Sequence, residues 1–179
     1  MILIISGTNR PNSYSHKLSL QMQTMLEQGG QASKVLSLED LPSDLPVSDL
    51  FGNRSEAMQK VMDTLIKPAK AFMIVAPEYN GSYPGILKVF LESLSADDDW
   101  KLMESRSVML VGLSAGRAGN LRGLDQLTSV LHYMGSSVYH EKLTLPGIGK
   151  ILSPEGAWVD EGSKAALQRR IDAFVSHIK

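Results

Sequence analysis

The chain has 179 residues, and its formal net charge at neutral pH is -1. This length fits one domain with a substantial core, and the near-neutral charge gives no basis for binding nucleic acid or an anionic membrane. No apolar run reaches the roughly 18 residues that a membrane helix needs, and no signal peptide is expected. Because cysteine is absent, disulfides and thiolate chemistry are excluded, which fits a cytoplasmic protein. Any redox chemistry must therefore come from a bound cofactor.

Apolar runs of strand length alternate with segments of helical period. Strands are expected at residues 1–5, 33–38, 71–76, 108–113 and, briefly, 137–140. Helices with one apolar face are expected around residues 18–26, 58–66, 87–94, 121–131 and 167–178, and residues 143–158 are expected to form a loop. This alternation predicts a single α/β domain over residues 1–179, a three-layer sandwich with a five-stranded parallel sheet. Right-handed crossovers favour the strand order 2-1-3-4-5.

The loop after the first strand, residues 6–16, is crowded with hydroxyl and amide side chains and leads into a helix N-terminus. Such an end offers unpaired N–H groups and positive partial charge, which suit a phosphate. The alternative is that one of these residues only caps the helix. The loop lacks the glycine pattern of a dinucleotide fold and the Gly-Lys-Ser/Thr of a P-loop. What remains is a monophosphate site in a flavodoxin-like sheet, for which FMN is the usual ligand. The candidate phosphate ligands are Thr8, Arg10, Ser13 and Ser15.

A second loop, residues 76–88, follows the third expected strand, where an open α/β sheet binds its ligand. Pro77 and Pro84 restrict this loop at both ends, and Gly81 and Gly85 let main chain approach a flat ligand. An ordinary surface turn is the alternative for residues 79–81.

The end of the fourth strand matches the G-x-S-x-G elbow of serine hydrolases, with Ser114 as the nucleophile. Asp160 and His177 even follow in the hydrolase chain order. An elbow turns directly into a helix, however, whereas Gly116 and Gly119 indicate a longer and wider loop here. A serine hydrolase is therefore the less favoured alternative. The four histidines have no metal-ligand spacing, so no metal site is expected.

Together the three loops resemble those of the NADPH-dependent FMN reductase family, a flavodoxin-like group that includes quinone, chromate and azo-dye reductases. Residues 7–15 are similar to the family's G-S-x-R-x-x-S-x-N phosphate loop, and residues 77–85 resemble its P-E-Y-N-x-S-x-P-G flavin loop. Residues 114–120 look like its third loop. There the family commonly has a Gly-Gly pair, whereas this chain has Asn120 at the second position, and Ser15 stands where asparagine is usual.

This resemblance implies an NAD(P)H-dependent oxidoreductase that passes electrons through FMN to a small acceptor by a ping-pong mechanism, with no catalytic acid or base. A flavodoxin-like electron carrier is the alternative, and the weak net charge argues against it. The resemblance also implies a homodimer or homotetramer. It assigns the flavin ring to Pro77, Glu78, Tyr79, Asn80 and Gly81 on one side and to Ser114 and Gly116 on the other.

Two arginines are candidates for selecting the nucleotide. The 2′-phosphate of NADPH needs a nearby cation, most often arginine. Arg117 lies in the third loop and Arg122 follows on the next turn. The alternative is that both are solvent-exposed residues at the start of a helix.

Overall fold

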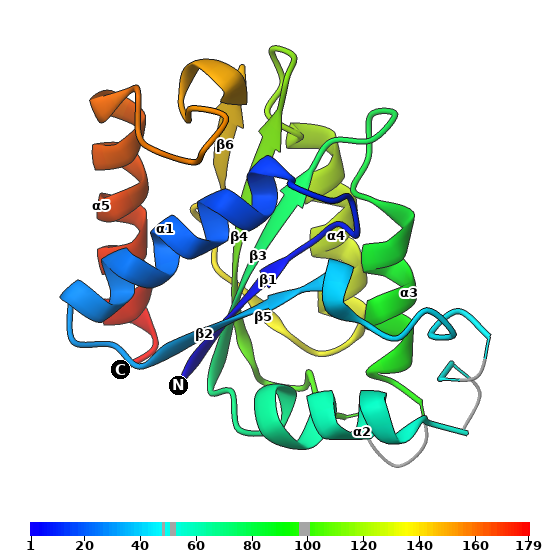
Figure 1. The fold of residues 1–179 in the computed structure, drawn as a ribbon. Helices are drawn as coiled ribbons and strands as arrows, with labels where there is room; N and C mark the ends of the chain where they lie inside the picture. The colour runs from blue at the N-terminus through cyan, green and yellow to red at the C-terminus, as the bar shows by residue number, and fades with distance from the viewer. Residues whose placement is uncertain (48, 51–52, 97–100) are drawn as a thin grey trace.

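The computed structural model describes residues 1–47, 49–50, 53–96 and 101–179. These form one six-stranded sheet, ordered β2-β1-β3-β4-β5, with β6 also paired to β4 (Figure 1). Every pair of neighbouring strands is parallel. The predicted order of five strands is therefore confirmed. The strands are β1 (Ile2–Ser6), β2 (Ser33–Ser37), β3 (Ala71–Pro77), β4 (Ser107–Ser114), β5 (Ser137–Val138) and β6 (Leu143–Pro146).

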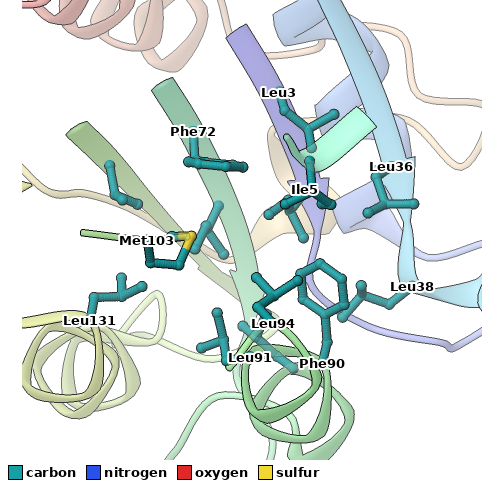
Figure 2. Close-up of a cluster of buried hydrophobic side chains, with 14 of the residues drawn as sticks. Leu3, Ile5, Leu36, Leu38, Phe72, Phe90, Leu91, Leu94, Met103 and Leu131 are labelled. Carbon is teal, nitrogen blue, oxygen red and sulfur yellow. The ribbon is translucent and has the colours of Figure 1, made fainter. Parts of the chain in front are cut away.

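Helices cover both faces of the sheet (Figure 1). Side chains of a strand alternate between the two faces, so each continuous apolar run supplies two cores. Leu3 and Ile5 of β1 join the core under α3 and α4, which Figure 2 shows, whereas Ile2 and Ile4 join the core under α1 and α5. The helices are α1 (Tyr14–Gln28), α2 (Glu56–Val61) continued by a π-helical turn (Met62–Ile66), α3 (Gly85–Ser93), α4 (Leu121–Tyr133) and α5 (Glu161–His177).

The expectation of a loop over residues 143–158 was wrong at its start, because β6 forms there. Leu143 lies opposite Val111 of β4, and Pro146 lies opposite Ser114. β5 pairs with the first two residues of β4, so β5 and β6 share one edge of that strand. A four-residue strand that ends in proline and is followed by glycine carries too little apolar pattern to be distinguished from a loop.

The parallel pairing brings the carboxyl ends of β1, β3, β4 and β6 to one edge of the sheet (Figure 1). The loops that follow these strands therefore meet there, although they are far apart in the sequence. None of the helices described combines the length and the apolar character needed to cross a membrane.

Candidate functional site

A cavity of about 550 Å3 lies at this edge. Its walls come from the loops after β1, β3 and β4 and from a short 3-10 turn (Ile148–Lys150) after β6. The chain leaves β1 toward α1 on one face and β3 toward α3 on the other, so the cavity lies at the topological switch point. The residues that line it are Thr8, Arg10, Pro11, Asn12, Ser13, Tyr14, Ser15, Pro77, Glu78, Tyr79, Leu113, Ser114, Ala115, Ile148 and Gly149.

A chain of hydroxyl groups in the first loop ends at this cavity. Ser6 Oγ donates to Ser15 Oγ over 3.4 Å, and Ser15 Oγ donates to Ser13 Oγ over 3.0 Å. Ser13 Oγ also accepts from the main-chain N–H of His16 at 3.2 Å, which makes Ser13 the N-cap of α1. Because Ser13 Oγ accepts both bonds, its own hydrogen remains available to a ligand in the cavity.

A second pair of hydroxyls joins the first loop to the second. Thr8 Oγ1 and the Tyr79 hydroxyl lie 2.8 Å apart, and either can be the donor. Thr8 Oγ1 also accepts from the main-chain N–H of Arg10 at 3.2 Å. The two hydroxyls carry two hydrogens, of which one lies between them, so the other can be donated to a third group. Arg10 is exposed at the rim of the cavity and adds a cation to this wall.

The Asn80-Gly81 pair makes a tight turn in the second loop. The N–H of Tyr79 donates to the carbonyl of Ser82 at 2.9 Å, and the N–H of Ser82 donates back at 3.0 Å. Asn80 and Gly81 both have positive φ, 52° and 79°, as a type I′ turn requires. Neither of them lines the cavity. Their part in the site is therefore to hold the turn that carries Tyr79.

Glu78 continues the sheet with its main chain and reaches the third loop with its side chain. Its N–H donates to the carbonyl of Leu113 at 2.9 Å. Its Oε2 accepts from the main-chain N–H of Asn120 at 3.1 Å, directly before the first residue of α4. The carboxylate thus lies at the positive end of a helix dipole, where a negative charge is favoured.

The third loop is tightly folded on itself and on β6. Ser114 Oγ accepts from the N–H of Gly119 at 2.9 Å and donates to the carbonyl of Gly116 at 3.1 Å. A Cβ on Gly119 would lie 2.8 Å from the Thr144 Cβ and 2.9 Å from the main-chain nitrogen of Leu145, so only glycine permits this approach.

This geometry does not support the serine hydrolase alternative. The Ser114 hydroxyl is engaged within its own loop, and α4 begins only at Leu121. Asp160 is the N-cap of α5, where it accepts from the N–H of Ser163 at 3.0 Å. His177 lies in the last turn of α5, and its ring packs 5.1 Å from the ring of Tyr139.

Most of the predicted site residues line the cavity: Thr8, Arg10, Ser13, Ser15, Pro77, Glu78, Tyr79 and Ser114 do so. Gly116, Arg117 and Arg122 do not, and both arginines are exposed beside the third loop. The lining residues that were not predicted from the sequence are Pro11, Asn12, Tyr14, Leu113, Ala115, Ile148 and Gly149. Pro11, Asn12 and Tyr14 could have been predicted, because they lie between predicted ligands in the sequence. Ile148 and Gly149 could not, because their place in the site depends on β6, which was not predicted.

A second cavity, of about 490 Å3, lies between α3 and α4 and includes Leu91, Val130 and Met134. Its remaining wall includes Glu104 and Gly135, which precede β4 and β5, so it lies toward the amino ends of the strands. None of residues 6–16, 76–84 and 114–120 contributes to it. Within the described part of the chain, no group of three or more histidine, aspartate or glutamate residues could hold a metal ion.

Comparison with known proteins identifies the family. The sequence profile of the family described as NADPH-dependent FMN reductase matches residues 1–148. The chain belongs to this family. An NADPH-dependent FMN reductase is an NAD(P)H-dependent flavoprotein oxidoreductase, so FMN and a nicotinamide nucleotide are its cofactor and co-substrate, as the resemblance had implied.

Curated relatives of this FMN reductase include quinone reductase from Escherichia coli (strain K12), which is 28% identical over 151 residues, or 80% of each chain. The FMN-dependent NADPH-azoreductase of Staphylococcus saprophyticus is 32% identical over 118 residues, which is 64% of this chain and 60% of the relative.

Among solved structures, the flavoenzyme FerB from Paracoccus denitrificans, an NAD(P)H:(acceptor) oxidoreductase, superposes with a TM-score of 0.81 at 25% identity. The alignment covers 99% of this chain and 96% of FerB. A flavodoxin from Pseudomonas aeruginosa superposes with a TM-score of 0.58 at 15% identity over 96% of this chain and 97% of its own. The second match concerns the fold alone, and it confirms the flavodoxin-like architecture.

Proposed function

We propose that the cavity holds FMN, with its phosphate at the first loop and its ring between the second and third loops. The observation that carries this placement is the set of available hydroxyl hydrogens, from Ser13 and from the Thr8–Tyr79 pair, beside the Arg10 cation. They surround the N-terminus of the 15-residue helix α1. A helix N-terminus, hydroxyl donors and a cation are the features that bind a phosphate. When bound, the flavin supplies the hydride and electron transfer between NAD(P)H and the acceptor.

The four residues of the phosphate side have different roles in this proposal. Arg10, Ser13 and Thr8 donate to the phosphate. Ser15 is 1% exposed and gives its hydrogen to Ser13. It therefore orients the Ser13 hydroxyl, whose single hydrogen points away from Ser15 and is donated to the ligand in this proposal.

The second and third loops, which enclose the flavin ring in this proposal, contribute the shape of the cavity more than hydrogen-bond donors. Pro77, Glu78 and Tyr79 form one wall, and the Asn80-Gly81 turn holds Tyr79 in place. Ser114 and Gly116 bound the opposite edge through the fold of the third loop. No side chain has to act as an acid or base, because the flavin carries the chemistry. NAD(P)H and the acceptor would use the same site in turn, which gives ping-pong kinetics.

The acceptor that we propose is a small quinone-type molecule, by analogy with the quinone reductase relatives. Arg117 and Arg122 are proposed to contact the 2′-phosphate of NADPH, because both are exposed near the third loop.

We also propose a homodimer or homotetramer in the cytoplasm. The support for an oligomer is that α4 exposes two large apolar side chains, Leu121 at 53% and Tyr133 at 94%. The support for the compartment is the absence of cysteine. Sedimentation equilibrium tests the oligomer, and a monomer at micromolar concentration contradicts it.

The central experiment is the visible spectrum of protein reconstituted with FMN, recorded before and after anaerobic NADPH or NADH. The expected result is a flavin spectrum that the nucleotide bleaches and that a quinone restores. Apoprotein should also bind FMN more tightly than FAD, since the first loop has room for one phosphate and no dinucleotide pattern. Tighter binding of FAD contradicts the assignment of the first loop.

A further inference from the structure

The wall that we assign to the flavin ring is held from behind by Asn120. We propose that Asn120 is a positioning residue for the cofactor, which fixes residues 76–78 in the conformation that FMN requires. This inference rests on the proposed function. In the third loop of the FMN reductase family a Gly-Gly pair is common, and this chain has Asn120 at the second position of that pair.

Asn120 contacts three successive residues where β3 leaves the sheet. Its Nδ2 donates to the carbonyl of Ala76 at 2.9 Å and to the carbonyl of Pro77 at 3.1 Å. Its main-chain N–H donates to Glu78 Oε2 at 3.1 Å. Asn120 itself is 1% exposed. The buried side chain of Asn120 therefore holds the main chain of two residues, and its main-chain N–H holds the charged group of a third.

This arrangement is maintained despite two unfavourable features. Asn120 has φ 67° and ψ 30°, in the left-handed region, which glycine adopts at less cost. Its Oδ1 is buried and has no hydrogen-bond partner among the residues described, which is also unfavourable. Glycine would avoid both costs. An unfavourable backbone conformation persists only where the surrounding contacts enforce it, and such conformations are concentrated at functional sites.

The same region of α4 also holds the far end of the second loop. A Cβ on Gly123 would lie 2.1 Å from Asn120 Oδ1 and 2.7 Å from the Tyr83 nitrogen, so the first turn of α4 packs directly on that loop. Ser82 Oγ donates to Gln126 Oε1 further along the helix. Residues 76–83 are thus attached to α4 at both ends. A wall ordered before binding lowers the entropy cost of taking up a ligand.

The test uses Asn120→Gly, which keeps the left-handed backbone and removes both side-chain donors. Hydrogen exchange of the apoprotein should become roughly tenfold faster for the Glu78 amide, while the amides of β1 remain protected. The dissociation constant for FMN should rise by a similar factor. A purely structural role predicts a different pattern, with faster exchange throughout the sheet and no specific loss of FMN affinity.

The matched control is Ser105→Gly. Ser105 also has a positive φ, 61°, but it is exposed and precedes the amino end of β4. This variant should change neither exchange at Glu78 nor FMN affinity.

Glu78→Gln weakens the same attachment from its other partner, so it keeps the inference testable if Asn120→Gly folds poorly: its FMN dissociation constant should also rise. A double-mutant cycle joins the two variants under conditions in which both fold. Gln retains an acceptor oxygen but not the charge. Since both variants weaken the same attachment, their effects on FMN affinity should be less than additive. Additive effects, or unchanged FMN affinity in Asn120→Gly, overturn the inference alone. Failure of the wild type to bind FMN overturns the proposed function and, with it, the cofactor role of Asn120.

Discussion

The two ends of the cavity use their polar groups differently. At the end formed by the first loop, Ser13 and the pair of Thr8 with Tyr79, which reaches across from the second loop, keep hydroxyl hydrogens available to a ligand. In the second and third loops the polar groups bind one another: Ser114 bonds Gly116 and Gly119, and Glu78 accepts from Asn120. The charged end of the ligand is thus met by donors, and the flat end by rigid main chain. Variants of the second and third loops should therefore alter FMN binding by changing the shape of the cavity, and variants of the first loop by removing hydrogen-bond donors.

The largest expected effect comes from Gly112→Ala. A Cβ at this position would lie 2.3 Å from the carbonyl oxygen of Gly119, which is main chain and cannot move away cheaply. We expect a loss of about 3 kcal/mol or more in the free energy of unfolding, measured by urea denaturation. Gly116→Ala is the control, because the nearest atom to its added Cβ is Ser114 Oγ at 4.0 Å. Equal losses in both variants would contradict the claim that the third loop is held by close main-chain packing.

Arg10→Ala tests the hydrogen-bond donors of the first loop, at the phosphate end of the cavity. Removing one charge-assisted hydrogen bond to phosphate costs on the order of 1.5–3 kcal/mol, so the FMN dissociation constant should rise roughly 10- to 100-fold. Fluorescence titration of apoprotein measures it. Arg10→Lys should recover part of the affinity, since it restores the charge but not the planar donor geometry. An unchanged constant at low salt would show that Arg10 points away from the ligand.

Ser13→Ala separates capping from ligand binding. Loss of the N-cap should lower stability by about 1 kcal/mol, and loss of the free hydroxyl hydrogen should raise the FMN dissociation constant roughly tenfold. Ser55→Ala is the matched variant, because Ser55 caps α2 in the same way, accepting from the N–H of Met58 at 3.2 Å. It should lose at least as much stability, because Ser55 Oγ also donates to Oδ2 of the buried Asp49 at 3.1 Å, and it should lose no FMN affinity. If both variants bind FMN like the wild type, Ser13 is only a cap.

Nucleotide selection should show a smaller effect. Arg117 and Arg122 are exposed, where a charge pair is worth at most about 1 kcal/mol, or roughly fivefold. Arg117→Ala or Arg122→Ala should raise the Michaelis constant for NADPH by about this factor and leave that for NADH nearly unchanged. Steady-state kinetics with both nucleotides measures this. Equal effects on the two nucleotides would place selectivity elsewhere.

Ser114→Ala is expected to have the smallest effect on turnover. Its hydroxyl is engaged within the third loop, so most NAD(P)H oxidation should survive. Assays of NADPH oxidation and of ester hydrolysis on the same preparations provide the check. Esterase turnover in the wild type that disappears in Ser114→Ala would instead support the hydrolase alternative.

Much of the fold could be predicted because its signals are local. The apolar runs of β1, β3 and β4 are buried on both faces, and the crossover rules then give the strand order. β6 could not be predicted, since its identity as a strand depends on pairing with β4 and not on its own four residues. The site shows the same division. The loop motifs identify Thr8, Ser13 and Glu78, which line the cavity.

The attachment of the second loop to α4 carries no local signal. Asn120 and the carbonyl of Ala76 are 44 residues apart in the sequence, and only the folded sheet brings them together. From the sequence, Asn120 is visible only as a departure from a glycine pair. Likewise, the sequence shows that Asn80-Gly81 suits a turn, but the Thr8–Tyr79 bond that this turn permits joins residues 71 positions apart.

The most direct test of the difference between the two ends is a parallel titration of apoprotein with FMN and riboflavin, which share a ring and differ in the phosphate. Available donors at the first loop predict that FMN binds at least about 100-fold more tightly, and that Arg10→Ala removes a large part of this ratio without weakening riboflavin. Equal affinities for FMN and riboflavin would contradict the account, because the first loop would then contribute nothing to binding.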